Sequence, residues 1–138
     1  MSTKLVLNEK RESLMKEALT AQEKAYSPYS KFKVGAALLT KDGKIFTGCN
    51  IENVSYGMTI CAERTAIFKA VSEGYTDFEA IAVSASSNDA IYPCGACRQV
   101  LAEFNPKIEI FVNHDEKNYT LMDLLPKSFD QNQLDSKN

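Results

Sequence analysis

A strand, helix, strand pattern between residues 78 and 112 constrains the fold more than any other part of the sequence. Phe78–Ser84 and Ile108–Val112 are apolar runs of the length and composition of buried strands. Cys94–Phe104 lies between them and has the apolar spacing of a short helix. Such a unit normally makes a right-handed crossover between two parallel strands. The chain is therefore expected to adopt an α/β fold.

The other strands are expected to pair antiparallel. Val34–Leu39 and Ile45–Ile51 flank the tetrapeptide Lys41-Asp42-Gly43-Lys44, whose Asp-Gly step is typical of a tight hairpin. A short edge strand is predicted at Tyr119–Leu121. Together with the parallel pair, these segments predict a mixed five-stranded sheet inside a three-layer α/β/α sandwich.

Two longer helices are predicted to cover this sheet. Within Asn8–Tyr26 an apolar stripe recurs every three or four residues and predicts a helix that Asn8 caps, with its stripe in the core: Leu14, Met15, Ala18, Leu19, Gln22 and Ala25. A second helix is predicted over Thr59–Ser72, ending before Gly74. A helical turn is expected at Met122–Leu125. No linker divides the 138 residues, so we expect one domain over residues 1–126 and a polar tail over residues 127–138.

Charge and hydropathy narrow the classes of function. Sixteen Lys and Arg residues against eighteen Asp and Glu residues leave a net charge of −2, with no basic stripe that would follow a phosphate backbone. No apolar stretch approaches the roughly 20 residues that a bilayer crossing needs, and the first eight residues do not resemble a secretion signal. We therefore expect a cytoplasmic protein that binds neither nucleic acid nor a membrane.

The cysteines carry the clearest chemical signal. The chain has four cysteines and one histidine, His114, which rules out any site that needs two histidines. Cys94 and Cys97 are three residues apart at a predicted helix start, so one helix face presents both, and Cys61 stands at the start of another helix. A helix N-terminus favours the thiolate, which is the form that binds zinc. Three protein ligands would leave the fourth zinc position open, as in catalytic rather than structural sites.

Charged residues beside these cysteines fit such a site. Glu63 follows Cys61 by two residues and is placed to accept a proton from a zinc-bound water and pass it to a substrate nitrogen. Three thiolates on one zinc ion carry a net charge of −1, which opposes ionisation of that water. Arg64 falls on the face of Cys61 and is expected to hydrogen-bond the sulfurs, and Arg98, four residues after Cys94, is a second candidate for this role.

Two non-catalytic interpretations of these cysteines compete with a catalytic zinc site. A Cys-x-x-C pair at a helix start after a strand is also typical of a thioredoxin-like redox site, although such a site needs neither Cys61 nor Glu63. A closed structural zinc site would need Cys49 as the fourth ligand. Cys49 is twelve residues from Cys61, and strand alternation turns it away from Asn50 and Glu52, so we interpret it as a buried packing residue.

Four segments together resemble the cytidine deaminase family in order and spacing: Ser27–Leu38, Gly48–Asn53, Cys61–Ala66 and Pro93–Gln99. The similarity runs from about Tyr26 to Pro126 and points to the small, homotetrameric, three-cysteine class. It implies one zinc ion per subunit on Cys61, Cys94 and Cys97, attack of a zinc-bound hydroxide on C4, and Glu63 as proton shuttle. The implied reaction converts cytidine and deoxycytidine to uridine and deoxyuridine plus ammonia, in pyrimidine salvage.

The same resemblance implies a set of substrate-binding residues. Asn50 and Glu52 would bind the ribose, Phe32 would pack on the base, and the backbone N–H of Ala62 would meet the pyrimidine O2. The family also implies that Tyr56 and a C-terminal aromatic residue, here Phe129, reach into a neighbouring subunit's pocket. Other substrates remain open, either a cytosine-containing antibiotic such as blasticidin S or, against the acidic charge balance, a nucleic-acid base.

Overall fold

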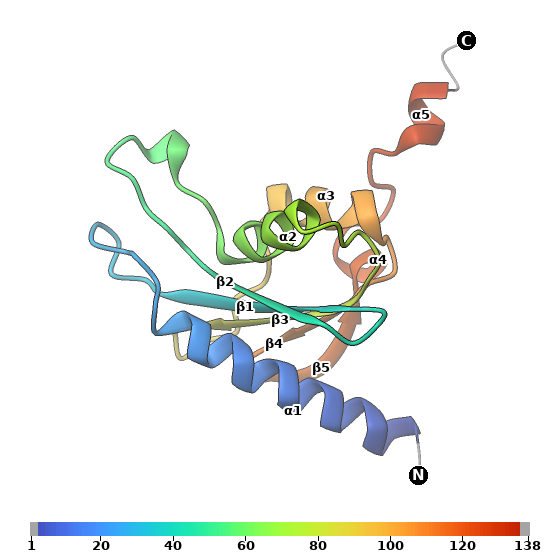
Figure 1. The fold of residues 1–138 in the computed structure, drawn as a ribbon, viewed down its shortest axis with the longest axis horizontal. Helices are drawn as coiled ribbons and strands as arrows, with labels where there is room; N and C mark the ends of the chain where they lie inside the picture. The colour runs from blue at the N-terminus through green and yellow to red at the C-terminus, as the bar shows by residue number, and fades with distance from the viewer. Residues whose placement is uncertain (1–2, 136–138) are drawn as a thin grey trace.

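The computed structural model describes residues 3–135, which form a twisted sheet with helices on both faces (Figure 1). In chain order the elements are α1 (Thr3–Gln22), β1 (Val34–Thr40), β2 (Ile45–Cys49), the 3-10 helix η1 (Tyr56–Met58), α2 (Ala62–Ser72), β3 (Phe78–Ala85), α3 (Gly95–Phe104), β4 (Glu109–Val112), β5 (Asp115–Thr120), α4 (Leu121–Leu124) and α5 (Gln131–Asp135).

The sheet has the predicted mixed topology. Its five strands lie in the order β2-β1-β3-β4-β5. β3 and β4 are parallel and are joined through α3, whereas the pairs β1 with β2, β1 with β3 and β4 with β5 are antiparallel. The predicted hairpin forms around Gly43, whose φ of 95° is a conformation that glycine adopts without strain. The α/β fold with a mixed five-stranded sheet is confirmed.

Strand alternation divides the core between the two faces of the sheet. In β3, Ile81 and Val83 belong to one buried cluster with residues of α2 and α3, and Ala80 and Ala82 belong to another with residues of α1. Figure 1 shows α1 below the sheet and α2 with α3 above it, which gives the three expected layers. The small residues on the lower face allow α1 to lie close to the strands.

Two glycines allow the helices to approach the sheet without a side chain between them. A Cβ atom on Gly35 would lie 2.1 Å from the carbonyl oxygen of Ala18 in α1. A Cβ atom on Gly48 would lie 2.5 Å from the nitrogen of Ala66 and 2.6 Å from the oxygen of Ala62, both in α2. Gly48 therefore sets how closely the first turns of α2 pack on β2.

The first helix differs from its predicted bounds. It begins before Asn8, which therefore lies inside α1 and is not its cap, and it ends at Gln22 rather than Tyr26. Tyr26 instead pairs with the backbone on both sides of Ile51, a contact that the local sequence pattern does not encode. The predicted apolar stripe is also only partly core, because Leu14 and Ala18 are buried but Leu19 is 52% exposed.

Long-range backbone pairing also changes other boundaries. The second helix begins at Ala62 rather than Thr59, because Ile60 forms an antiparallel bridge with Ile51. The edge strand β5 is longer than Tyr119–Leu121, since it starts at Asp115, directly after the turn at His114. The predicted polar tail contains α5, which Figure 1 shows standing away from the sheet, and its last three residues lie outside the described part of the chain.

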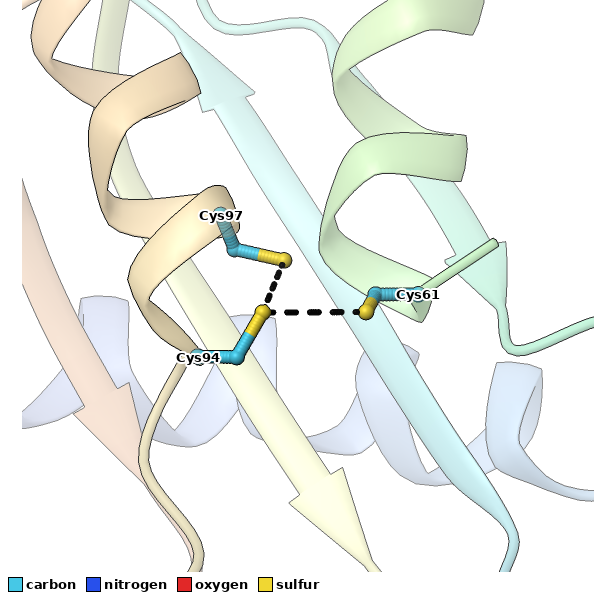
Figure 2. Close-up of side chains that lie close together, drawn as sticks. All are labelled: Cys61, Cys94 and Cys97. Atoms are coloured by element: carbon cyan, nitrogen blue, oxygen red, sulfur yellow. Dashed lines mark hydrogen bonds between the residues drawn. The ribbon is translucent and has the colours of Figure 1, made fainter. Parts of the chain in front are cut away.

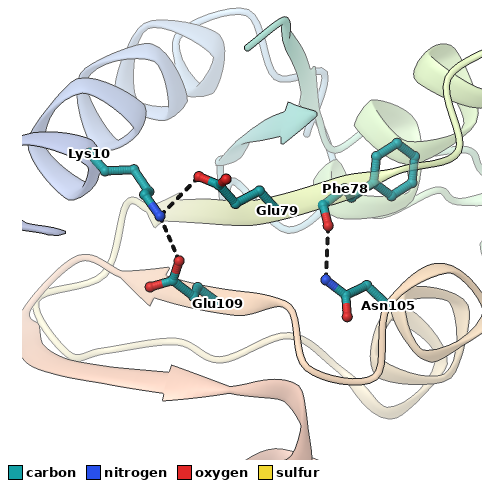
Figure 3. Close-up of polar contacts among 5 residues, drawn as sticks. All are labelled: Lys10, Phe78, Glu79, Asn105 and Glu109. Atoms are coloured by element: carbon teal, nitrogen blue, oxygen red, sulfur yellow. Dashed lines mark hydrogen bonds and ion pairs between the residues drawn. The ribbon is translucent and has the colours of Figure 1, made fainter. Parts of the chain in front are cut away.

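A partly exposed ion network ties α1 to the two parallel strands (Figure 3). Lys10 Nζ lies 2.9 Å from Glu79 on β3 and 2.7 Å from Glu109 on β4. Partial burial lowers the pKa of Lys10, but its bonds to the two carboxylates outweigh this and raise the pKa overall. Lys10 thus separates two like charges on neighbouring strands. At the start of β3, Asn105 donates to the Phe78 carbonyl at 2.8 Å (Figure 3).

Lys10→Met should lower the free energy of unfolding by about 1 kcal/mol, because Glu79 and Glu109 would then repel each other without a cation between them. Denaturant titration measures this. Lys41→Met is the matched control, since Lys41 pairs with Asp77 at 3.8 Å and both side chains are more than half exposed. The difference between the two variants in the free energy of unfolding should be smaller in high salt. Equal losses for the two variants would contradict the prediction.

Within residues 3–135, none of the helices combines the length and the apolar content that crossing a bilayer requires.

Candidate metal and substrate site

Three cysteine sulfurs from two helices meet at one point (Figure 2). Cys61 Sγ lies 3.8 Å from Cys94 Sγ, which lies 3.4 Å from Cys97 Sγ. The three sulfur atoms all lie within 4.8 Å of one another. Cys97 is fully buried, Cys61 is half-buried and Cys94 is exposed, so the group opens to solvent on one side.

The helix starts predicted for these cysteines are confirmed. Cys61 is the N-cap residue of α2 and Cys94 is the N-cap residue of α3, and neither side chain caps its own helix. Cys97 lies in the first turn of α3, next to Cys94, as a three-residue spacing requires. The positive ends of two helices therefore face the sulfur atoms and favour thiolates there.

The geometry fits a zinc ion. Tetrahedral thiolates at about 2.3 Å from zinc lie about 3.8 Å from one another, close to the separations found here. Within residues 3–135 this is the only group of three or more Cys, His, Asp or Glu side chains with such spacing, and no fourth side chain of these types joins it. A zinc ion held by Cys61, Cys94 and Cys97 would keep one coordination position for a non-protein ligand.

Cys49 is outside the group. Its sulfur points to the Lys24 carbonyl at 3.5 Å, on the α1 side of the sheet, so a closed four-cysteine site is not formed. Strand alternation therefore predicted its direction correctly. The expected full burial is wrong, because Cys49 ends β2 at the margin of the sheet and stays half-buried.

Arg64 partly compensates the charge of the sulfurs. Its Nη2 atom donates to Cys61 Sγ at 3.1 Å. The pKa of Cys61 falls to about 5, because Cys97 hydrogen-bonds its sulfur and Arg64 adds a second bond and a positive charge. The pKa of Cys97 rises, because its proton is held between the two sulfurs and the thiol is buried.

Glu63 is a buried carboxyl group beside the sulfurs. It lies in the first turn of α2 and is only 5% exposed. Burial raises its pKa to about 7, and the neighbouring Cys61 charge adds to this effect. A carboxyl group whose pKa lies near neutrality can both accept and return a proton.

A pocket of about 240 Å³ connects these groups with the predicted base-binding residues. The starts of α2 and α3 contribute Cys61, Ala62, Glu63 and Cys94, the loop before β1 contributes Phe32, and the segment after β2 contributes Asn50. Ala62 is fully buried at the start of α2, where backbone N–H groups lack helical partners. The pocket thus combines an apolar wall, two helix N-termini and a titratable carboxyl group.

The two predicted ribose residues face different hollows. Asn50 lines this pocket, where its side chain accepts from Val34 N at 2.9 Å and donates to the Phe32 carbonyl at 2.8 Å, leaving one amide N–H for a ligand. Glu52 lines an adjoining hollow of about 390 Å³ that also touches Thr59. The regular strand expected through both residues is wrong, since β2 ends at Cys49 and only single bridges continue it.

Glu52 is held as an anion by the loop that precedes β1. Its carboxylate accepts from the Ser30 hydroxyl and from the backbone nitrogens of Tyr29 and Ser30 at 3.0 and 3.1 Å. These bonds lower its pKa, the Ser30 hydroxyl most strongly. Glu52 therefore also orders the loop between the pocket and the adjoining hollow.

The two aromatic residues predicted to act between subunits are exposed within one chain. Tyr56 is 75% exposed and lines the hollow of Glu52, where its ring lies edge-on to Tyr29. Phe129 is 55% exposed and lies outside the pocket, with its carbonyl bound by Gln99 Nε2 at 2.8 Å.

Arg98 has a different function from the one considered for it. Its Nε atom donates to the Pro93 carbonyl and its Nη1 atom to the Leu124 carbonyl, both at 2.7 Å. It therefore braces the backbone before Cys94 against the end of α4 rather than bonding the sulfurs. Sequence spacing placed Arg98 on the correct helix, but not the two carbonyl groups that face it.

Sequence reasoning missed six further residues that line the pocket: Val34, Thr59, Ile60, Val83, Ile91 and Tyr92. Their only local signal is position, since Ile91 and Tyr92 precede Pro93-Cys94 and Thr59 precedes Cys61. Their placement depends on how α2, α3 and β3 meet.

Comparison with known proteins identifies the family of this site. A family model described as "Cytidine and deoxycytidylate deaminase zinc-binding region" matches residues 8–113. The chain belongs to this deaminase family. A cytidine deaminase from Sporosarcina psychrophila is 52% identical over 127 residues, covering 89% of this chain and 93% of its own. One from Halalkalibacterium halodurans is 54% identical over 123 residues, covering 86% and 93%.

Solved structures of the deaminase family share the fold. The crystal structure of cytidine deaminase from Burkholderia pseudomallei superposes with a TM-score of 0.81 at 51% sequence identity, covering 86% of this chain and 98% of that one. Taken with the three-sulfur group, the family places this chain among zinc-binding deaminases, which are enzymes, and not among redox proteins.

Proposed function

We propose that this protein hydrolyses the exocyclic amine of cytidine and deoxycytidine, producing uridine or deoxyuridine and ammonia, and so serves pyrimidine salvage. One observation carries the proposal: a buried carboxyl group, Glu63, shares a pocket with a three-cysteine group that leaves a zinc position open. Relatives about half identical over most of the chain, all cytidine deaminases by name, support the substrate class.

The metal-binding, proton-transferring and base-binding residues each have a proposed task in this reaction. Zinc on Cys61, Cys94 and Cys97 would supply Lewis-acid activation of the attacking water. Glu63 accepts a proton from that water and delivers one to the leaving amine, which its near-neutral pKa suits. The Ala62 N–H group donates to the pyrimidine O2, and the ring of Phe32 packs on the base.

The ribose is proposed to lie toward the second hollow. The free amide N–H of Asn50 can donate to one sugar oxygen, and the carboxylate of Glu52 can accept from a hydroxyl group. Thr59 touches both hollows, so a nucleoside can extend from one to the other. This polar pair favours a plain ribose, and so favours cytidine over blasticidin S as the substrate.

The substrate is tested by following ammonia release from cytidine, deoxycytidine, cytosine, CMP, blasticidin S and a cytosine-containing oligonucleotide. We expect turnover of the first two and little from the others. Turnover of blasticidin S alone would support the antibiotic alternative, and turnover of the oligonucleotide alone would support a nucleic-acid deaminase. No ammonia from either nucleoside would overturn the proposal.

We also propose a cytoplasmic homotetramer in which neighbouring subunits complete each pocket, the catalytic domain being residues 1–126 and residues 127–138 its tail. Four free thiols suit a reducing compartment. Val54, Tyr56 and Met58 are each at least 70% exposed beside the hollow of Glu52, and such apolar exposure favours contact with another copy.

Sedimentation should give four times the mass of 15.3 kDa, and Tyr56→Ala should raise the KM for cytidine.

Arg64→Gln should lower kcat about 10- to 100-fold while zinc stays bound, because the uncompensated thiolate charge opposes ionisation of the attacking water. Zinc content and kcat are measured on the same sample. Lys69→Gln is the control, since Lys69 is an exposed cation of the same helix that bonds the Thr47 carbonyl. An unchanged kcat would show that Arg64 does not tune the site.

A further inference from the structure

The loop of residues 86–93, between β3 and α3, forms one wall of the pocket through Ile91 and Tyr92. The pocket crosses the end of the sheet, with Asn50 following β2 at one side and Val83 of β3 in the middle. Tyr92 bonds Asp115 at the start of β5, at the far edge of the sheet. Tyr92 and Asn50 therefore bound opposite sides of the pocket.

The phenol of Tyr92 is anchored at its hydroxyl. Tyr92 donates to Asp115 Oδ2 at 2.5 Å, and Tyr119 donates to the same oxygen at 2.7 Å. The two rings lie edge to face with centroids 5.7 Å apart. Asp115 Oδ1 accepts from Lys117 N at 2.9 Å, so both carboxylate oxygens are occupied.

The anchor itself is tied to the opposite layer of the fold. Arg11 of α1 donates to the Asp115 carbonyl and, at 2.7 Å, to the Val112 carbonyl. The two tyrosine hydroxyls and the Lys117 amide lower the pKa of Asp115 to about 2, so the carboxylate remains an acceptor at neutral pH. The position of Tyr92 is thus determined by contacts outside the pocket.

The geometry points to Tyr92 as a specificity-determining residue that contacts the C5 edge of the pyrimidine ring while Asp115 holds it in place. This inference rests on the proposed function. If Ala62 and Glu63 take the O2 and N3 edge from α2, and Asn50 lies on the ribose side, the remaining ring edge is C5 and C6. Tyr92 is two residues from Cys94, so it lies at the reacting end of the pocket, next to C5.

Three variants distinguish a Tyr92 ring that contacts the substrate from one that only supports the fold. Tyr92→Leu shortens the wall, Tyr92→Phe keeps the ring but loses the anchor, and Tyr119→Phe removes the other hydroxyl from the same Asp115 oxygen. The kcat and KM values of each are measured with cytidine and 5-methylcytidine. Calorimetry with uridine and 5-methyluridine reports binding without turnover.

Tyr92→Leu should raise the ratio of kcat/KM for 5-methylcytidine to kcat/KM for cytidine about 10-fold. The affinity for 5-methyluridine relative to that for uridine should rise in the same way. Tyr92→Phe should keep this ratio and raise the KM for cytidine about 3-fold at constant kcat, because the ring is less well positioned. Tyr119→Phe should change neither quantity.

A Tyr92→Leu ratio within twofold of the wild type would overturn the inference. If Tyr92→Leu does not fold, the comparison of Tyr92→Phe with Tyr119→Phe decides, and equal KM values for these two would overturn it. The wild-type protein with cytidine is the reference. If the wild-type protein does not deaminate cytidine, that result counts against the proposed function and not against the role of Tyr92.

Discussion

Glu63→Gln should reduce kcat for cytidine about a thousandfold while the protein keeps its zinc, because an amide cannot carry the proton between water and the leaving amine. The substitution preserves the shape of a side chain that is only 5% exposed. It also removes a carboxyl group whose burial is unfavourable when charged, so thermal stability should not fall. Ammonia release, zinc analysis and thermal unfolding measure the three quantities.

Glu73→Gln is the matched control for this substitution. Glu73 is an exposed residue directly after the same helix, and its side chain is far along α2 from the sulfurs. It should leave kcat and zinc content unchanged. A Glu63→Gln protein with near wild-type turnover would refute the proton-transfer role, and one without zinc would show that Glu63 acts through the metal site instead.

Gly48→Ala should lower the free energy of unfolding by about 3 kcal/mol, because the new methyl group overpacks the contact with α2. The added Cβ would lie 2.5 Å from Ala66 N and 2.6 Å from Ala62 O, so the helix has to move. That movement displaces Cys61 and Glu63 relative to α3. A misplacement of about 1 Å should cost about 100-fold in kcat and weaken zinc retention against a chelator.

Substitutions at two other glycines distinguish overpacking against α2 from a general loss of stability as the cause of zinc loss. Gly57 has no atom near the position of a new Cβ, so Gly57→Ala should change stability by less than about 0.5 kcal/mol. Gly35 contacts α1 on the opposite face, so Gly35→Ala should destabilise the protein but leave the zinc affinity of the folded fraction unchanged. If Gly35→Ala and Gly48→Ala lose zinc equally, the close approach of α2 has no special importance for the site.

Local patterns predicted the elements but not all of their ends. Continuous apolar runs predicted β3 and β4, because a strand buried on both faces is apolar throughout, and the Asp-Gly step between two further segments predicted the hairpin of β1 and β2. Tyr26 and Ile60 were assigned to helices because nothing nearby in sequence shows that each pairs with the segment at Ile51.

The metal ligands could be predicted more completely than the substrate pocket. Cys94 and Cys97 lie on one face of one helix turn, and a thiolate beside a helix N-terminus has its own chemistry, so spacing and residue type sufficed. Arg98 shows the limit of this reasoning. Its position relative to Cys94 predicted a sulfur contact, whereas the carbonyl groups of Pro93 and Leu124 take its guanidinium group.

By itself, the sequence determined the class of fold, the three sulfur ligands and the carboxyl group beside them, because each has a signature within a few residues. Only the tertiary structure decided that Asn50 and Glu52 line separate hollows, and that Tyr92 lines the pocket while its hydroxyl group bonds Asp115. These outcomes depend on how closely α1 and α2 pack on the sheet and on which strand ends they bring together. Contacts between such distant segments produce no periodic pattern in the sequence, so the sequence alone does not predict them.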